Sequence, residues 1–113
     1  MQSWKILEIS WWKSKLSWIL VKDSTTRPYK EKVKDNVSLR KFYSDVDENE
    51  LVWHRDREDR TIVVLEKTDW LIQVDNQLPL PLRKGASIFI PKGMYHRVIK
   101  GADDLVIKVT KHS

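Results

Sequence analysis

Short runs of apolar and β-branched residues, each about five residues long, recur along the chain from residue 37 onward. Turn-forming residues separate these runs at intervals of about 8–12 residues, a spacing typical of all-β sandwiches and barrels. Apolar positions with helical spacing give little support for helix after residue 30. The pattern predicts an all-β domain with strands at Ser38–Ser44, Leu51–Asp56, Arg60–Glu66, Trp70–Val74, Ser87–Ile90, His96–Lys100 and Leu105–Val109.

Glycine and proline mark two of the corners between these strands. Gly85 fits a turn that needs a backbone without a Cβ atom. Pro91 and Gly93 build a second sharp turn directly before His96. A histidine at the start of a strand, beside a tight corner, can direct its side chain inward.

The N-terminal part of the chain is less regular. We predict a strand at Leu16–Val21, whereas Met1–Lys15 fits helical and strand spacing equally well. The segment Lys30–Asp35 is almost entirely charged, so we expect it to be exposed. These differences divide the chain into an N-terminal arm, residues 1–36, and a barrel, residues 37–113.

Charge is distributed unevenly between these parts. Residues 1–44 contain 10 Lys or Arg and 4 Asp or Glu, whereas residues 45–113 contain 11 and 12. A basic arm can bind nucleic acid or a membrane surface, although such charge more often forms a solvated face. We favour the solvated face, and nucleic acid is not the expected partner.

Four of the six tryptophans lie within the arm, at Trp4, Trp11, Trp12 and Trp18. Interleaved with lysines, they could stack on single-stranded nucleic acid or sit at a lipid interface. Clustered aromatic side chains are more often buried, and a subunit interface would bury them. We therefore expect a homodimer to which the arm contributes.

The composition narrows the possible chemistry and location. The chain has no cysteine, which excludes disulfides, thiolate metal ligands and a cysteine nucleophile and suits a reducing cytoplasm. Lysines interrupt the apolar N-terminal segment, and no apolar run approaches the roughly 18 residues of a membrane helix. We expect a soluble, cytoplasmic protein without a transmembrane segment.

Two motifs carry a more specific signal. Gly85, Pro91, Gly93 and His96 stand at the spacing Gly, five residues, Pro, one residue, Gly, two residues, His. This spacing resembles the second conserved motif of the cupin superfamily at every fixed position. Upstream, residues 53–60 (Trp-His-Arg-Asp-Arg-Glu-Asp-Arg) resemble the first cupin motif, which usually reads His, any residue, His, three or four residues, Glu. The resemblance implies a cupin-type jelly-roll barrel and, as is usual in that superfamily, a dimer.

The first motif departs from the cupin pattern at two ligand positions. Asp56 stands where the second histidine is usual, and Arg60 stands where a glutamate ligand is common. The resemblance therefore implies His54 and His96 as metal ligands and allows Asp56 as a third. It gives no ligand at Arg60, because a guanidinium does not bind metal ions.

The residue types at these positions permit metal chemistry. Side chains two apart on a strand share a face, so His54 and Asp56 point the same way. With His96 on a neighbouring strand, two imidazoles and one carboxylate can converge into a facial triad that would bind Fe(II), Mn, Ni or Zn. Alternatively, Asp56 and Arg60 form a buried ion pair and the pocket is free of metal.

The sequence therefore leaves two principal functions open. One is a metal-dependent small cupin that acts on a small anionic molecule by oxygenation, isomerisation or lyase chemistry. Asp56 and Arg60 are its candidate catalytic residues, and Arg60, Gln73 and Trp70 are its candidate substrate contacts. The other is a non-catalytic cupin that binds a small ligand without metal.

Overall fold

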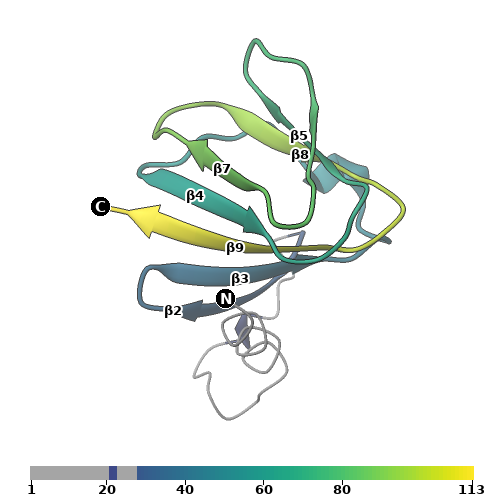
Figure 1. Ribbon diagram of the computed structural model, residues 1–113, viewed down its shortest axis with the longest axis horizontal. Coiled ribbons are helices and arrows are strands. Elements are labelled where there is room, and N and C mark those ends of the chain that lie inside the picture. The colour runs from purple at the N-terminus through teal and green to yellow at the C-terminus, as the bar shows by residue number, and fades with distance from the viewer. Residues whose placement is uncertain (1–20, 23–27) are drawn as a thin grey trace.

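The computed structural model describes residues 21–22 and 28–113, which form two antiparallel β-sheets (Figure 1). The larger sheet has the strand order β1-β2-β3-β9-β4-β7, and the smaller has the order β6-β5-β8. The strands are β1 (Val21–Lys22), β2 (Lys30–Lys34), β3 (Val37–Phe42), β4 (Asp59–Val64), β5 (Leu71–Val74), β6 (Leu80–Pro81), β7 (Ser87–Ile90), β8 (His96–Ile99) and β9 (Leu105–His112).

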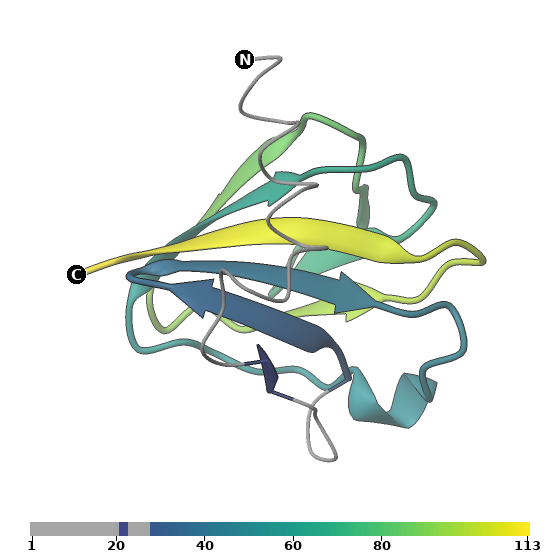
Figure 2. The same cartoon turned by 90° about the horizontal axis from the view of Figure 1, so that it is seen from below.

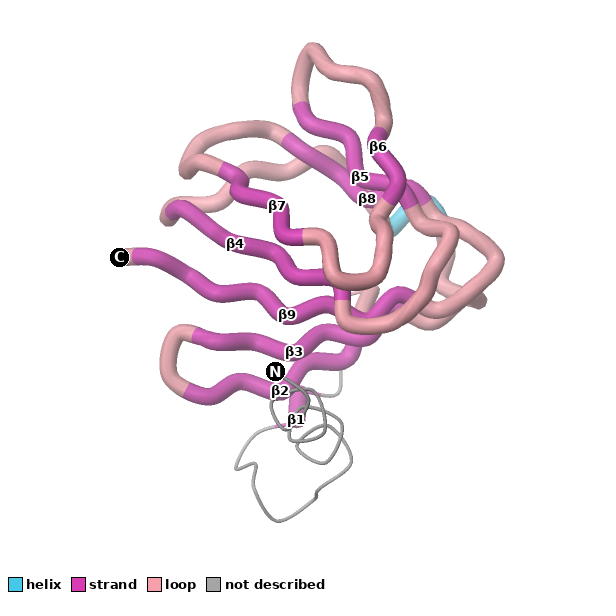
Figure 3. Tube along the Cα trace, in the orientation of Figure 1, coloured by secondary structure: helices cyan, strands magenta, loops and turns pink. Residues whose placement is uncertain are grey.

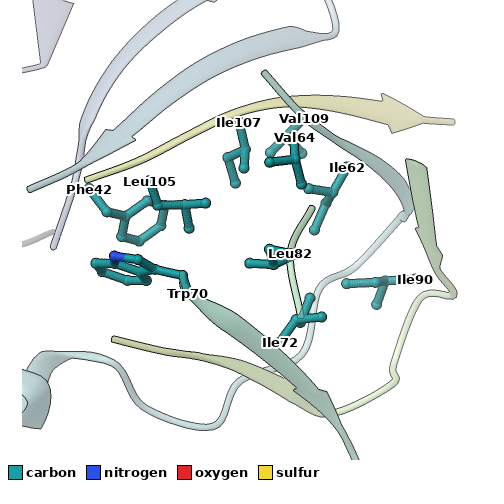
Figure 4. Close-up of a cluster of buried hydrophobic side chains, with 10 residues drawn as sticks. All are labelled: Phe42, Ile62, Val64, Trp70, Ile72, Leu82, Ile90, Leu105, Ile107 and Val109. Carbon is teal, nitrogen blue, oxygen red and sulfur yellow. The ribbon is translucent and has the colours of Figure 1, made fainter. Parts of the chain in front are cut away.

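The two sheets face one another across a shared hydrophobic core (Figures 2 and 3). Alternate residues of β3, β4 and β9 point toward the smaller sheet, because successive side chains of a strand leave opposite faces. The all-β prediction is confirmed. The core cluster comprises Phe42, Ile62, Val64, Trp70, Ile72, Leu82, Ile90, Leu105, Ile107 and Val109 (Figure 4).

Most predicted strands appear within one or two residues of their expected bounds, but two segments differ. Leu51–Asp56 is not a continuous strand: it follows the short 3₁₀ helix η1 (Glu48–Glu50) and makes a single β-bridge at His54. Lys30–Asp35 is exposed only in part: most of it is β2, paired with β3, and Lys30, Val33, Lys34 and Asp35 are exposed as expected. Glu31 and Lys32 are buried there.

Predictions for residues 1–20 and 23–27 lie outside the described residues, as do the four tryptophans of the arm. The division at residue 36 and the homodimer stay predictions. Within residues 21–22 and 28–113, no helix is long and apolar enough to span a membrane.

One glycine is required for a close approach between two loops. Both carboxylate oxygens of Asp69 accept backbone hydrogen bonds, from the N–H groups of Ala102 (2.8 Å) and Asp103 (2.9 Å). A Cβ atom on Gly101 would overlap this carboxylate and the backbone of Asp69. These hydrogen bonds lower the pKa of the Asp69 carboxyl, so the loop contact is made by the ionised form.

We therefore expect Gly101→Ala to lower the free energy of unfolding by about 1–3 kcal/mol, the usual cost of an overpacked contact. Urea denaturation followed by tryptophan fluorescence would measure the change. Ala102→Ser, at an exposed neighbouring position, is the matched control and should change stability by less than about 0.5 kcal/mol. Wild-type stability in Gly101→Ala would contradict the proposed contact.

Candidate metal centre

Two histidines that lie far apart in the chain are joined by an antiparallel β-bridge. The N–H of His54 donates to the carbonyl of His96 (3.0 Å), and the N–H of His96 donates to the carbonyl of His54 (2.9 Å). Directly opposed residues of an antiparallel pair place their side chains on the same face. The ring centroids are accordingly 4.3 Å apart. The predicted convergence of the two imidazoles is confirmed.

The corner at Pro91 and Gly93 fixes the position of Asp56. Gly93 has φ of 79°, a left-handed conformation that glycine adopts without steric penalty. In this conformation its N–H donates to the backbone carbonyl of Asp56 (2.9 Å). The preceding N–H, of Lys92, donates to the Asp59 carboxylate (2.8 Å). The turn of the second motif is therefore hydrogen-bonded to the first motif, at the backbone of Asp56 and the side chain of Asp59.

Backbone carbonyls determine which ring nitrogens carry protons. His54 Nδ1 lies 3.0 Å from the carbonyl of Val52, and His96 Nδ1 lies 2.9 Å from the carbonyl of Met94. A carbonyl oxygen can only accept, so each Nδ1 must be the donor. In the neutral rings both Nε2 atoms then carry lone pairs, the form in which imidazole binds metals.

His96 is held in this neutral form. Its side chain is buried, and burial lowers its pKa below the usual value because the charged imidazolium is poorly solvated there. The neighbouring His54 and the charge of Arg60 act in the same direction, whereas the Met94 carbonyl and Asp56 oppose it. The net effect lowers the pKa.

The Asp56 carboxylate divides its oxygens between two neighbours. Oδ1 lies 3.4 Å from Nη1 of Arg60, and Oδ2 lies 3.4 Å from Nε2 of His96. Oδ2 is buried and has no hydrogen-bond partner among the described residues. Because the Nε2 of neutral His96 carries a lone pair, two acceptor atoms face each other, and a buried polar group left in this way costs free energy.

Arg60 lies on β4 and is anchored by carboxylates. Its Nη2 and Nε donate to the same oxygen of Glu58, at 2.7 Å and 3.0 Å. The hydrogen bond from Arg60 is the main cause that lowers the pKa of the Glu58 carboxyl, and its charge adds to the effect. The predicted ion pair between Asp56 and Arg60 is confirmed, and Glu58 pairs with Arg60 as well. Asp56 therefore lies between the guanidinium and the two imidazoles.

A cavity of about 400 Å³ adjoins these residues, a size that suits a small molecule. His54, Asp56, Arg60 and His96 all contribute to its wall, together with apolar core residues from both sheets. The wall also contains four polar or charged residues that the sequence did not suggest for the site. They are Tyr29, Arg40, Glu50 and Lys111.

Two of the predicted substrate contacts lie elsewhere. Trp70, expected as a substrate contact, is instead fully buried in the core, where its indole N–H donates to the carbonyl of Asp103. Gln73 is on the opposite face of β5 from buried Ile72, and its side chain accepts two hydrogen bonds from Arg97. Neither is among the described residues that line the cavity.

The side chains beside the histidines point away from the centre, as alternation predicts. The guanidinium of Arg97 stacks over the ring of Trp53, 4.8 Å from its centroid. Arg55 similarly lies over the ring of Tyr95. These contacts occupy the outer side of the bridge.

The three candidate ligands fit a single metal ion. One ligand atom from each of His54, Asp56 and His96 can be chosen so that all lie within 4.8 Å of one another. Facial ligands at about 2.0–2.2 Å from a common ion lie about 3 Å apart, so these side chains would draw closer together on binding an ion. The unpartnered Oδ2 supplies the negative charge that such an ion needs.

No protein-family model matches the chain, and no curated protein matches it in sequence. Solved structures share its fold. A cupin-family protein with a double-stranded β-helix fold from Methanocaldococcus jannaschii aligns with TM-score 0.62 and 14% identity over 88% of this chain and 90% of its own.

Two enzymes align over a smaller share of their length. The DMSP lyase DddQ from Ruegeria pomeroyi DSS-3 aligns with TM-score 0.60 and 13% identity over 68% of this chain. The Fe(II) form of HppE aligns with TM-score 0.57 and 16% identity over 74% of this chain. The chain spans only 37% of the lyase and 48% of HppE.

These alignments and the two motifs agree on one architecture, which confirms the predicted jelly-roll barrel. The chain has the double-stranded β-helix fold of the cupin superfamily.

Proposed function

We propose that the protein binds a divalent transition-metal ion through His54, Asp56 and His96 and uses it to act on a small molecule held in the adjoining cavity. The observation that carries this proposal is the pair of acceptor atoms, Oδ2 of Asp56 and Nε2 of His96, facing each other without a proton donor. A cation between them would relieve the repulsion. Two imidazoles and a carboxylate suit Fe(II), Mn, Ni or Zn.

The similar solved structures support this proposal. One is a lyase and another contains Fe(II). A bound ion held by these three residues would supply Lewis-acid chemistry toward a substrate oxygen. Arg60 would orient Asp56 and leave Oδ2 for the ion, because its guanidinium engages only Oδ1.

The ion pair between Asp56 and Arg60 favours a second candidate, a non-catalytic pocket that binds a small ligand without metal. Here Arg60 alone would compensate the carboxylate. Metal binding separates the two candidates directly.

Chelator-treated protein should bind one Co²⁺ or Zn²⁺ per chain. Asp56→Asn and His96→Ala should each weaken the affinity at least about 100-fold, since loss of even an outer partner of a ligand costs 10–100-fold. Isothermal titration calorimetry, with elemental analysis of the loaded protein, would measure both effects.

His112→Ala is the matched control. His112 is an exposed histidine whose Nε2 is 2.8 Å from the Thr61 hydroxyl, and it does not line the described cavity. Its variant should bind metal as the wild type does. A wild-type protein that takes up no metal would contradict the proposed function and favour the metal-free pocket.

The lowered pKa of His96 predicts a pH dependence in the metal-free protein. Between the folded pKa and the unfolded value of about 6.5, the unfolded chain binds more protons, so stability rises with pH. The contribution is complete above about pH 6.5 and is lost as the pH falls through the folded pKa.

Urea denaturation of chelated protein at several pH values below 7 should show this slope. In His96→Asn, which lacks the titrating ring, the slope should be smaller. An identical slope in the two proteins would show that His96 is not held neutral by burial.

A further inference from the structure

The cavity wall contains an arginine that the metal centre does not use. Arg40 lies on β3, where alternation places it on the same face as the core residue Phe42. Its side chain is only 11% exposed, and it lines the cavity that adjoins His54, Asp56 and His96.

Three neighbours hold the Arg40 guanidinium from one side. Its Nε donates to the carboxylate of Glu31 (3.0 Å) and to the hydroxyl of Ser38 (3.2 Å). The Ser38 hydroxyl itself donates to the same Glu31 oxygen. The planar head lies over the ring of Tyr29, with Cζ 4.6 Å from the centroid, so its orientation is fixed by hydrogen bonds and stacking together.

This arrangement leaves the opposite edge of the guanidinium available. Within the described residues, neither terminal nitrogen of Arg40 makes a hydrogen bond. The two terminal NH₂ groups of an arginine match the two oxygens of a carboxylate or a phosphate. A pre-oriented guanidinium binds such an oxyanion with little loss of side-chain entropy.

Arg60 is less suited to the same role. Each of its three nitrogens already engages a carboxylate oxygen, Nε and Nη2 on Glu58 and Nη1 on Asp56. Its charge is therefore compensated by two carboxylates. Within residues 28–113, one carboxylate pairs with Arg40: the carboxylate of Glu31, which contacts Nε and neither terminal nitrogen.

We propose that Arg40 is the residue that binds the anionic group of the small molecule, and that Arg60 instead positions Asp56. Arg40 would hold the oxyanion while another part of the same molecule reaches His54, Asp56 and His96. The statement about these three residues rests on the proposed function. Lys111, also on the cavity wall, adds positive charge. The ligand class is a small carboxylate or phosphate.

The test uses metal-free protein, with acetate and inorganic phosphate as separate probes at constant ionic strength. The Nε–H resonances of the arginines, followed by NMR, would report binding at each guanidinium. The Arg40 signal should shift with at least one probe, and the preferred probe distinguishes a carboxylate from a phosphate site. Arg40→Gln should weaken binding of that probe about tenfold or more.

Arg97→Gln is the matched control. Arg97 is also a half-buried arginine that stacks on an aromatic ring and bonds a side-chain oxygen, but it lies on the outer side of the bridge. Its loss changes the net charge equally, so the affinity for the probe should change less than about twofold. Arg40→Lys keeps a charge beside Glu31 and carries the test if Arg40→Gln does not fold. It should still weaken binding severalfold, because lysine lacks the planar pair of donors.

Three outcomes would overturn the inference: no probe binding in the wild type, unchanged affinity in the folded Arg40 variants, or an equal loss in Arg97→Gln. Titration of the same proteins with Co²⁺ keeps the two proposals apart. If Co²⁺ binds and the anions do not, only the role of Arg40 fails. If the anions bind through Arg40 and Co²⁺ does not bind, only the metal function fails.

Discussion

The candidate site depends on two backbone hydrogen bonds between His54 and His96. These hydrogen bonds place two residues from distant parts of the chain directly opposite each other. The geometry of an antiparallel pair then places both imidazoles on one face. Each ring is held by a carbonyl two residues before it, which fixes the tautomer as well as the position. Without this bridge, neither the shared cavity wall nor the approach of Asp56 to His96 would follow from the rest of the fold.

Charge is arranged around the bridge so that each arginine has a separate role. Asp56 stands between the guanidinium of Arg60 and the imidazoles, and one of its oxygens stays free. The positive charge of Arg60 would repel a bound cation, but the Asp56 carboxylate lies between Arg60 and the candidate metal position. Arg40 lies at another part of the cavity wall and is held by Glu31 and Tyr29, and its terminal nitrogens make no hydrogen bond to any residue that the structure describes. The same cavity wall thus contains the three candidate metal ligands and the arginine that we propose as an anion contact.

The sequence predicts most of the strands and the two corners because these depend on local chemistry. The spacing of Gly93 and His96 requires a tight turn before a strand, and the structure has both. Trp70 could not be placed in the same way, since a bulky residue at the start of a strand fits a rim or a core equally well. Arg40 was missed because its partner Glu31 lies in the charged segment Lys30–Asp35, which we expected to be exposed. Burial of such a cluster depends on pairing between β2 and β3, which local pattern does not reveal.

The central claim is that His54, Asp56 and His96 converge on one cation. Anomalous diffraction from crystals of the protein loaded with Co²⁺, collected at the cobalt edge, would test it most directly. We expect one strong peak bounded by Nε2 of both histidines and Oδ2 of Asp56. A cobalt peak elsewhere on the chain, or fully loaded crystals in which the two rings point away from the ion, would contradict the account.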